Sequence, residues 1–392
     1  MKVYLTDMGL VNGLGSDRSA VAQALFAGER AFQPCDWVPD RSTFVSAVTA
    51  ALPDLPPELA VFNSRNTRLA CSALTQLNGG LEQARARYAP ERIAVVAGTS
   101  TSGIAEGEVA VAAELRGAPL PPQYHYQAQE IGNLGQVVAR LVGARGPAYT
   151  ISTACSSSAH ALASARRLLA TGMADAVIAG GADSLCRLTV NGFAALESVS
   201  QGVCSPFSQN RDGINIGEAA AFFLVTREPL VQRIELLGVG ASSDAHHISA
   251  PDPQGKGAEA AIRAALHQAE LAPEAVDYIN LHGTGTALND AMEASVIDRL
   301  FPQRPLCSSS KGQLGHTLGA AGATEAALIW LALTGHGGKL PPHIFDGHYD
   351  PALPRLNLVP QDNHAAAGAR VCLSNSFAFG GNNAAVIMHA GH

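Results

Sequence analysis

Three residues of the sequence combine side chains suited to thiolate chemistry with turns of small residues: Cys155, His282 and His316. Cys155 lies in the stretch ISTACSSSAH (151–160), between a β-prone run and an Ala- and Leu-rich pattern with helical spacing over 159–170. The unpaired N–H groups and the positive dipole at the start of such a helix favour a thiolate over a thiol. Cys155 is therefore a candidate nucleophile, although a buried structural cysteine before a serine N-cap gives the same local pattern.

The two histidines stand in glycine-rich turns next to predicted regular elements. His282 occurs in NLHGTGT, directly after a buried strand, and His316 occurs in SKGQLGH, directly before a long Ala-rich helix. Either histidine alone is more typical of a satisfied structural residue. Together with a cysteine at a strand-to-helix turn, however, they supply the residue types that thiolate chemistry needs. Polar groups in such turns are more typical of a site than of packing.

The composition excludes several classes of protein. With 392 residues, of which 47% are hydrophobic and 15% charged, the sequence is typical of a compact protein with a large core. A net charge of −7 and the lack of basic runs argue against a nucleic-acid partner. The seven cysteines are single and scattered, which favours neither a disulfide framework nor a metal site. No signal peptide and no apolar run of ~18 residues is evident, which predicts a cytoplasmic protein without a membrane span.

Strand and helix patterns alternate, which predicts an α/β protein with mixed sheets and helices between and outside them. Strands are predicted at 2–15 (ending in a glycine-rich turn), 93–98, 148–151, 175–181, 219–226, 234–240, 276–281, 306–308, 371–375 and 384–389. Helices are predicted at 16–28, 64–88, 104–116, 127–143, 159–170, 255–270, 289–300 and 319–334. The proline-rich segment 34–57 is predicted to be irregular. Two small-residue turns, at 155–159 and 315–322, each lead into a helix too apolar for the surface, which predicts two pseudo-duplicated halves with central helices back to back.

Four blocks of the sequence resemble the signature motifs of the β-ketoacyl-acyl-carrier-protein synthases. They are TACSS (153–157), HGTGT (282–286), KGQLGH (311–316) and NSFAFGG (375–381). The resemblance is to the elongating Cys-His-His type, which includes synthases I and II and the polyketide ketosynthases. It extends, in order, over essentially the whole chain.

This resemblance implies a thiolase-like fold, in which residues 1–230 and 231–392 form two mixed-sheet halves of a five-layer α-β-α-β-α arrangement. It also implies a decarboxylative Claisen condensation, which extends a fatty-acid, polyketide or polyene chain by two carbons. Cys155 would carry the acyl group as a thioester, and His282 and His316 would assist decarboxylation of a malonyl thioester. The implied partners are acyl carrier protein and a second subunit, in a homodimer or a heterodimer with a homologue. No cofactor is required beyond the phosphopantetheine arm of the carrier protein.

The resemblance also assigns roles around these three residues. Lys311 would orient the histidines and hold charge near the site, and Glu325 matches an acidic residue on the following helix, although a plain helix-face carboxylate is the alternative. Phe379 would act as a gate, and its backbone N–H would join that of Cys155 in holding the acyl oxyanion. Residues implied to contact the acyl chain or the pantetheine arm are Thr284, Thr286, Ser249, Ile104, Phe193 and Phe377.

Two further pairs are implied to have supporting roles. Asp290 and Glu293 match an acidic pair that supports a loop, but they would also suit the first turn of a helix by complementing its dipole. Arg65 and Arg68 open a helix that in the family faces the acidic carrier protein, although a solvated helix start is the plainer interpretation. Ala378 departs from the glycine of the family motif, which restricts the backbone of the gate loop and predicts stiffer gating.

Two other functions remain as alternatives. A chain-length-factor-like partner subunit would have the same fold, but such subunits typically lack the nucleophile, whereas Cys155 and both histidines are present. A thiolase acting on coenzyme A is disfavoured by the block at Lys311 and by the position of Cys372 within a predicted strand. The departures from the family motifs favour a specialised secondary-metabolite synthase over a housekeeping enzyme.

Overall fold

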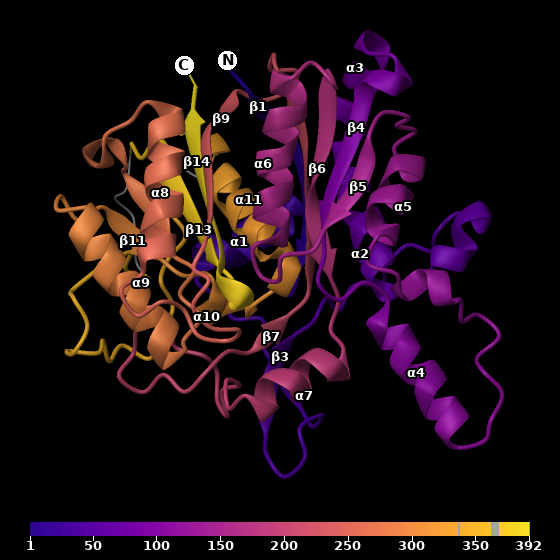
Figure 1. Cartoon of the computed structure of the whole chain (residues 1–392), viewed down its shortest axis with the longest axis horizontal. Coiled ribbons are helices and arrows are strands. Elements are labelled where there is room, and N and C mark those ends of the chain that lie inside the picture. Colours follow the sequence, from indigo (N-terminus) through magenta and orange to yellow (C-terminus); the bar gives the residue numbers. More distant parts are fainter. Residues whose placement is uncertain (336–337, 362–367, 392) are drawn as a thin grey trace.

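The computed structural model describes residues 1–335, 338–361 and 368–391, and eleven of its strands form one continuous sheet (Figure 1). The strand order is β12-β11-β10-β13-β14-β9-β1-β8-β6-β4-β5. Its two halves meet where β1 pairs with β9, and that junction has a single register pair, Tyr4 with Glu235. The sheet is therefore two five-stranded sheets with a narrow connection, extended at one edge by β12 (Asn357–Leu358).

The two halves repeat the same strand topology. The N-terminal half contains, in chain order, β1 (Tyr4–Asn12), β4 (Ile93–Gly98), β5 (Ala148–Ile151), β6 (Ala176–Asp183) and β8 (Ala219–Thr226). The C-terminal half contains β9 (Ile234–Ser243), β10 (Tyr278–Asn280), β11 (Leu306–Ser308), β13 (Val371–Phe377) and β14 (Asn382–Ala390). In each half the fifth strand lies antiparallel between the first and the fourth, and the fourth, second and third strands are parallel. The predicted pseudo-duplication is confirmed.

Two small-residue helices fill the space between the half-sheets. They are α6 (Ser157–Ala170), which follows the third strand of the first half, and α11 (Ala321–Thr334), which follows the third strand of the second. Every residue of α11 from Ala321 to Ala332 is buried, as its largely apolar sequence predicts. The helices approach so closely that a Cβ on Gly322 would lie 2.7 Å from that of Ala159.

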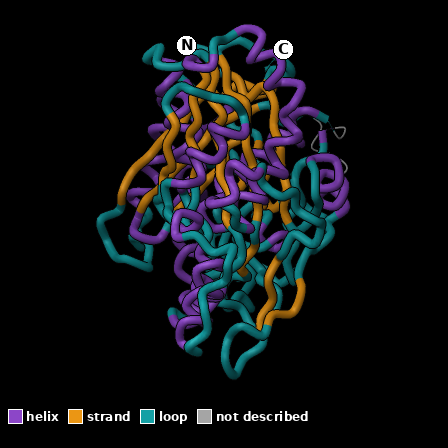
Figure 2. The backbone as a smooth tube through the Cα atoms, turned by 90° about the vertical axis from the view of Figure 1, so that its right-hand side faces the viewer, coloured by secondary structure: helices purple, strands orange, loops and turns teal. Residues whose placement is uncertain are grey.

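Further helices cover the two outer faces of the sheets (Figures 1 and 2). They are α2 (Arg65–Leu74), α3 (Asn78–Arg87) and α5 (Asn133–Leu141) on the first half, and α8 (Lys256–Ala269) and α9 (Ala287–Leu300) on the second. The remaining helices are α1 (Arg18–Ala27), α4 (Ile104–Leu115), α7 (Arg187–Ala195) and α10 (Lys311–Leu314). The layers are thus α-β-α-β-α, as expected for the thiolase-like fold. Within the described part of the chain, no helix is long and apolar enough to cross a membrane.

The local structure differs from the predictions at several places, and the helix predicted over 127–143 is a 3₁₀ turn at Tyr126–Gln129 followed by α5. The helix predicted over 64–88 is divided into α2, a 3₁₀ turn and α3, because Gln76 turns toward β1 and its Nε2 donates to the Leu10 carbonyl at 2.9 Å. The segment 34–57, predicted to be irregular, contributes β2 (Gln33–Cys35) and β3 (Thr43–Ser46) to a small second sheet with β7 (Ile216–Gly217). Helix α7 was not predicted.

Candidate active site

Cys155 lies in the turn between β5 and α6, as the sequence predicts, two residues before the first helical residue Ser157. Ala154 holds this turn in the left-handed conformation, with φ of 52°. The hydroxyl of Ser157 fixes the turn twice, since it accepts from the Thr153 N–H at 2.9 Å and donates to the Ala154 carbonyl at 2.6 Å. A sharp strand-to-helix turn of this kind presents a nucleophile at the end of a sheet.

The two histidines lie after neighbouring strands of the C-terminal half of the large sheet, β10 and β11. His282 follows β10, and its backbone N–H donates to Glu293 at 2.8 Å. His316 follows the short helix α10, after Gly315, whose φ of 70° suits only glycine without strain. The backbone N–H of His316 donates to the Asn215 carbonyl at 2.7 Å. Backbone hydrogen bonds therefore fix the main chain that carries both imidazoles.

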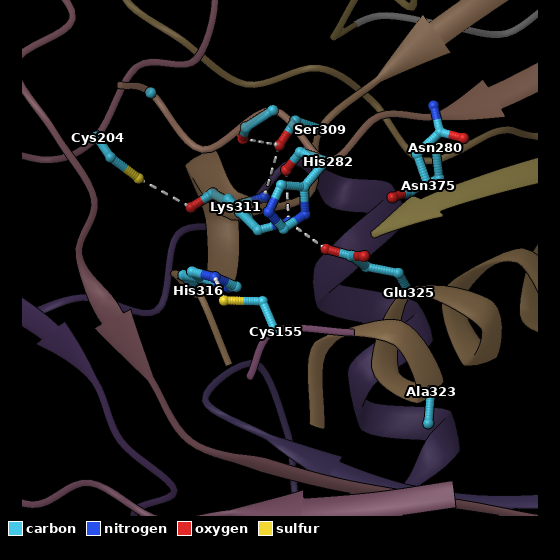
Figure 3. Close-up of polar contacts among 12 residues, drawn as sticks. Cys155, Cys204, Asn280, His282, Ser309, Lys311, His316, Ala323, Glu325 and Asn375 are labelled. Carbon is cyan, nitrogen blue, oxygen red and sulfur yellow. Dashed lines mark hydrogen bonds and ion pairs between the residues drawn. The ribbon is translucent and has the colours of Figure 1, made fainter. Parts of the chain in front are cut away.

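The fold brings these three residues together (Figure 3). The His316 Nε2 lies 2.9 Å from the Cys155 Sγ, and the two imidazole rings meet edge to face with centroids 5.3 Å apart. One ligand-type atom from each of Cys155, His282 and His316 lies within 4.8 Å of the other two, and all three residues are buried. Residues up to 161 positions apart in the sequence thus share one small volume, which is the arrangement that a thiol nucleophile with two proton donors requires.

A buried ion pair between Lys311 and Glu325 contacts His282. The Lys311 ammonium donates to the His282 carbonyl at 2.5 Å, lies 3.5 Å from the His282 Nδ1, and pairs with Glu325 on α11. Both charged side chains are 2% exposed. Glu325 is therefore not a solvated helix-face carboxylate, and its charge balances that of Lys311 close to the reacting groups.

The Lys311–Glu325 pair leads to a prediction about the free energy of unfolding. Glu325→Leu leaves the Lys311 ammonium buried without a counter-ion, and we expect the free energy of unfolding to fall by about 3–5 kcal/mol. The double variant Lys311→Met/Glu325→Leu removes both charges, so we expect most of that stability to return while activity stays low. Denaturant midpoints of the two variants and the wild type test this; a double variant no more stable than Glu325→Leu would contradict it.

Burial controls the protonation of the reacting groups. It lowers the pKa of both His282 and His316 well below the usual range, helped in each case by the Lys311 charge, so both imidazoles are neutral at pH 7. Burial also raises the pKa of the Cys155 thiol to about 12, against the opposing effects of Lys311 and of a hydrogen bond from the Phe379 backbone. The helix N-terminus favours a thiolate, but burial opposes this effect and is the larger of the two, so the resting sulfur is a thiol.

Because both histidines are neutral, we expect the rate of decarboxylation to depend little on pH. An imidazole with the ordinary pKa of about 6.5 would lose roughly fourfold of its neutral form between pH 8 and pH 6. Because the pKa values of His282 and His316 are lowered, we expect decarboxylation to change less than this over that range. Glu293, whose pKa burial raises to about 7, titrates in the same window. Glu293→Gln is therefore the control. If the decarboxylation rate of this variant still falls fourfold between pH 8 and pH 6, the prediction is contradicted.

A cavity of about 350 Å³ leads to the sulfur and is lined by all three reacting residues. The predicted substrate contacts that line it are Phe193, Ser249, Thr284, Thr286 and Phe377, and the predicted gate residue Phe379 lines it as well. The hydroxyls of Thr284 and Thr286 lie 2.9 Å apart, and the rings of Phe193 and Phe379 have centroids 5.3 Å apart. Ile104 does not line this cavity; it is the first residue of α4.

The predicted supporting acids are buried beneath the cavity. Glu293 accepts from the backbone N–H groups of His282 and Gly283, at 2.8 and 2.7 Å. Asp290 accepts from the N–H of Phe207 at 2.8 Å and of Gly285 at 3.2 Å, and burial raises its pKa to about 6. Both carboxyl groups fix the loop that carries His282, in addition to any effect on the helix dipole.

The two predicted docking arginines are partly engaged within the chain. Arg65 forms an ion pair with the buried carboxylate of Glu218 and donates to the Val48 carbonyl at 2.8 Å. Arg68 donates to the Leu52 carbonyl at 2.8 Å, and its side chain is 34% exposed. Their docking role stays a prediction. For Arg65, contact with a carrier protein would compete with the ion pair to Glu218.

Asp183, which the sequence interpretation missed, joins the two halves beside the site. Its carboxylate accepts from Thr99, Ser100 and Thr101 of the first half and from the Gly319 N–H of the second, at 2.5 Å. The available signal was a carboxylate at the end of the buried strand β6, in the run AVIAGGAD. The cavity wall also includes Arg211, which was not predicted.

Comparison with known proteins identifies the family. Family models described as beta-ketoacyl synthase, N-terminal and C-terminal domain, match residues 2–229 and 234–345. A relative named 3-oxoacyl-[acyl-carrier-protein] synthase 2, from Coxiella burnetii, is 32% identical over 99% of this chain and 98% of its own length.

Solved structures agree with this assignment. A chain of a ketosynthase in complex with its chain length factor, from Xenorhabdus doucetiae, matches with a TM-score of 0.94 and 46% identity, over 100% of this chain and 98% of its own length. A chain of the ishigamide ketosynthase/chain length factor matches with a TM-score of 0.87 and 28% identity, over 100% and 99%. With a buried cysteine and two histidines converging at the end of its cavity, the chain belongs to the β-ketoacyl synthase family.

Proposed function

We propose that this protein is a 3-oxoacyl synthase in which Cys155 carries the growing acyl chain and His282 and His316 drive decarboxylative condensation with a malonyl thioester. The observation that carries the proposal is the convergence of one sulfur and two neutral imidazoles at the end of one cavity. A thiol nucleophile and two N–H donors are the groups that an acyl transfer followed by an enolate requires.

Acylation begins at the thiol. The 2.9 Å contact between the Cys155 Sγ and the His316 Nε2 is short enough for the ring to take the thiol proton as the sulfur attacks the incoming thioester. The tetrahedral oxyanion is held by the backbone N–H groups of Cys155 and Phe379, and the released thiol of the donor recovers the proton. Acylation therefore requires no resting thiolate.

Condensation follows in the same place. The malonyl thioester loses carbon dioxide, and the electron pair of the broken C–C bond moves onto its carbonyl oxygen as an enolate. N–H groups of the two neutral imidazoles stabilise that oxygen as charge develops. The enolate carbon then attacks the acyl carbonyl on Cys155, and the C–S bond breaks. The departing Cys155 thiolate takes up one proton from water to restore the thiol, and the product is a 3-oxoacyl thioester two carbons longer.

The substrates arrive on a carrier-protein arm. The 3-oxoacyl synthase relative carries acyl carrier protein in its name, and the cavity wall offers Thr284, Thr286 and Ser249 as hydrogen-bond partners for a pantetheine chain. Phe379 stands at the sulfur as the gate, with Phe193 and Phe377 on the acyl side. Both arginines are partly exposed, but Arg65 is paired with the buried Glu218, whereas the partner of Arg68 is the exposed Asp54. Arg68 is therefore the better candidate for contact with an acidic carrier.

We also propose a dimer, either of two copies or with a homologous subunit, as in the ketosynthase–chain length factor complexes. A chain-length-factor role for this chain itself is not favoured, because the nucleophile and both histidines are present. Residues 1–230 and 231–392 are proposed as its two functional halves. All seven cysteines are free thiols, which agrees with a cytoplasmic location.

The test is a condensation assay on the purified protein. We expect acyl-carrier protein and malonyl-carrier protein to give a carrier-bound product heavier than the starting acyl chain by two carbons, two hydrogens and one oxygen, with release of carbon dioxide, as measured by intact mass. Acetyl-coenzyme A replaces the malonyl donor as control. Condensation with acetyl-coenzyme A as efficient as with malonyl-carrier protein would indicate a thiolase and overturn the proposal.

A further inference from the structure

The three reacting residues also form a set of soft metal ligands. A thiolate and two imidazoles are the groups that zinc prefers, and catalytic zinc sites use three protein ligands with a fourth position open. With Zn–S of about 2.3 Å and Zn–N of about 2.0 Å, tetrahedral geometry places the sulfur and each nitrogen about 3.5 Å apart. The separations here, from 2.9 Å for Sγ–Nε2 up to 4.8 Å, bracket that value.

The surroundings of the three ligands suit a bound cation in two respects. The cavity of about 350 Å³ reaches Cys155, His282 and His316, so it offers both an access path and space for a water molecule as fourth ligand. Among the charges near the site, Lys311 and Glu325 are paired and cancel one another, and the buried carboxylate of Asp183 adds a negative charge that acts on Cys155. A cation bound to one thiolate would therefore add one net positive charge to the site.

Lys311 opposes metal binding through a specific contact. Its ammonium lies 3.5 Å from the His282 Nδ1 and can donate to that nitrogen. An imidazole that binds a metal through Nε2 must carry its proton on Nδ1, where it would face the ammonium. Lys311 therefore weakens the site without removing a ligand.

We propose that Cys155, His282 and His316 together bind one thiophilic divalent cation such as Zn²⁺, and that this binding blocks acylation. The sulfur releases one proton when it binds the cation, and no other bond is made or broken. Binding rests on the geometry alone, whereas the inhibition rests on the proposed role of Cys155 as nucleophile. An acyl group on Cys155 removes the thiolate ligand, so acylation and metal binding exclude one another.

Cobalt provides a direct probe, because Co²⁺ bound to a thiolate has a charge-transfer absorption that activity assays do not report. We expect one Co²⁺ per chain to give this band, Zn²⁺ to displace it, and Mg²⁺ to have no effect, because magnesium prefers oxygen ligands. Cys155→Ala and His316→Ala should each weaken Co²⁺ binding by at least about 10- to 100-fold. In other metal sites, loss of a residue that only hydrogen-bonds to a ligand already costs this much. Cys307→Ala, which removes a different buried thiol, should retain the band.

The outcomes separate the two proposals. Absence of a Cys155-dependent band in a protein that condenses normally overturns the metal site and leaves the proposed function intact. A Cys155-dependent band with unimpaired condensation at saturating Zn²⁺ overturns the nucleophile assignment instead. Lys311→Met/Glu325→Leu should bind Co²⁺ more tightly than the wild type, and weaker binding would contradict the role given to Lys311.

Discussion

Cys155→Ala is expected to abolish formation of the acyl-enzyme and to lower condensation by a factor on the order of 10⁴ or more. The alanine cannot form a thioester, and no second thiol lines the cavity within the described residues. The change is small in volume, so the fold should be retained. The measurement is intact mass of the protein after incubation with acyl-carrier protein, together with the yield of 3-oxoacyl product.

Cys307→Ala is the matched control, because Cys307 is equally buried but lies in β11, where its sulfur donates to the Pro305 carbonyl at 3.2 Å. This control should acquire the acyl adduct as the wild type does. An adduct of the same mass on the Cys155→Ala protein would place the nucleophile elsewhere and contradict the assignment. Loss of the adduct in both variants would point to a general loss of structure.

The positions of the site residues could be predicted because each stands next to a local signal. Cys155 and His282 each follow a strand, His316 lies between α10 and α11, and small residues stand beside all three. Polar residues in such turns are typical of a site. The duplication was visible for a similar reason, since two helices too apolar for the surface must both be buried. Local patterns of this kind depend on neighbouring residues alone.

The protonation states could not be predicted, because they depend on how far the whole fold excludes water from the titratable groups. The helix N-terminus next to Cys155 is a local feature that lowers a thiol pKa, whereas burial of the sulfur results from residues of both halves and raises it to about 12. Asp183 was missed on the same grounds: its donors, Thr99, Ser100, Thr101 and Gly319, lie 82 or more positions away from it. A carboxylate at the end of a strand does not reveal such partners.

The thiol pKa also explains why two histidines are needed. A sulfur that is neutral at rest must transfer its proton during acylation, and His316 is the ring in contact with it at 2.9 Å. His282 contacts Lys311 instead and is held through its backbone by Glu293. From this difference we propose that His316 serves both half-reactions, while His282 serves the decarboxylation.

That division leads to the second large effect. His282→Ala is expected to lower decarboxylation of malonyl-carrier protein by about 10²–10⁴-fold, because one N–H donor to the enolate oxygen is lost. Acylation of Cys155 should remain within a few-fold of the wild type, because the contact between its sulfur and His316 is unchanged. Carbon dioxide release and acyl-enzyme mass, measured on the same preparation, give the two rates.

His316→Ala is the informative comparison, because it removes a donor to the enolate and also the proton acceptor beside the sulfur. We expect it to lower decarboxylation as His282→Ala does and to slow acylation more strongly, while leaving some acyl-enzyme at long times. Glu293→Gln serves as a milder variant, since it keeps both rings and loosens only the loop that carries His282. Normal decarboxylation in both histidine variants with loss of acylation would reverse the roles, because the rings would then serve the thiol alone.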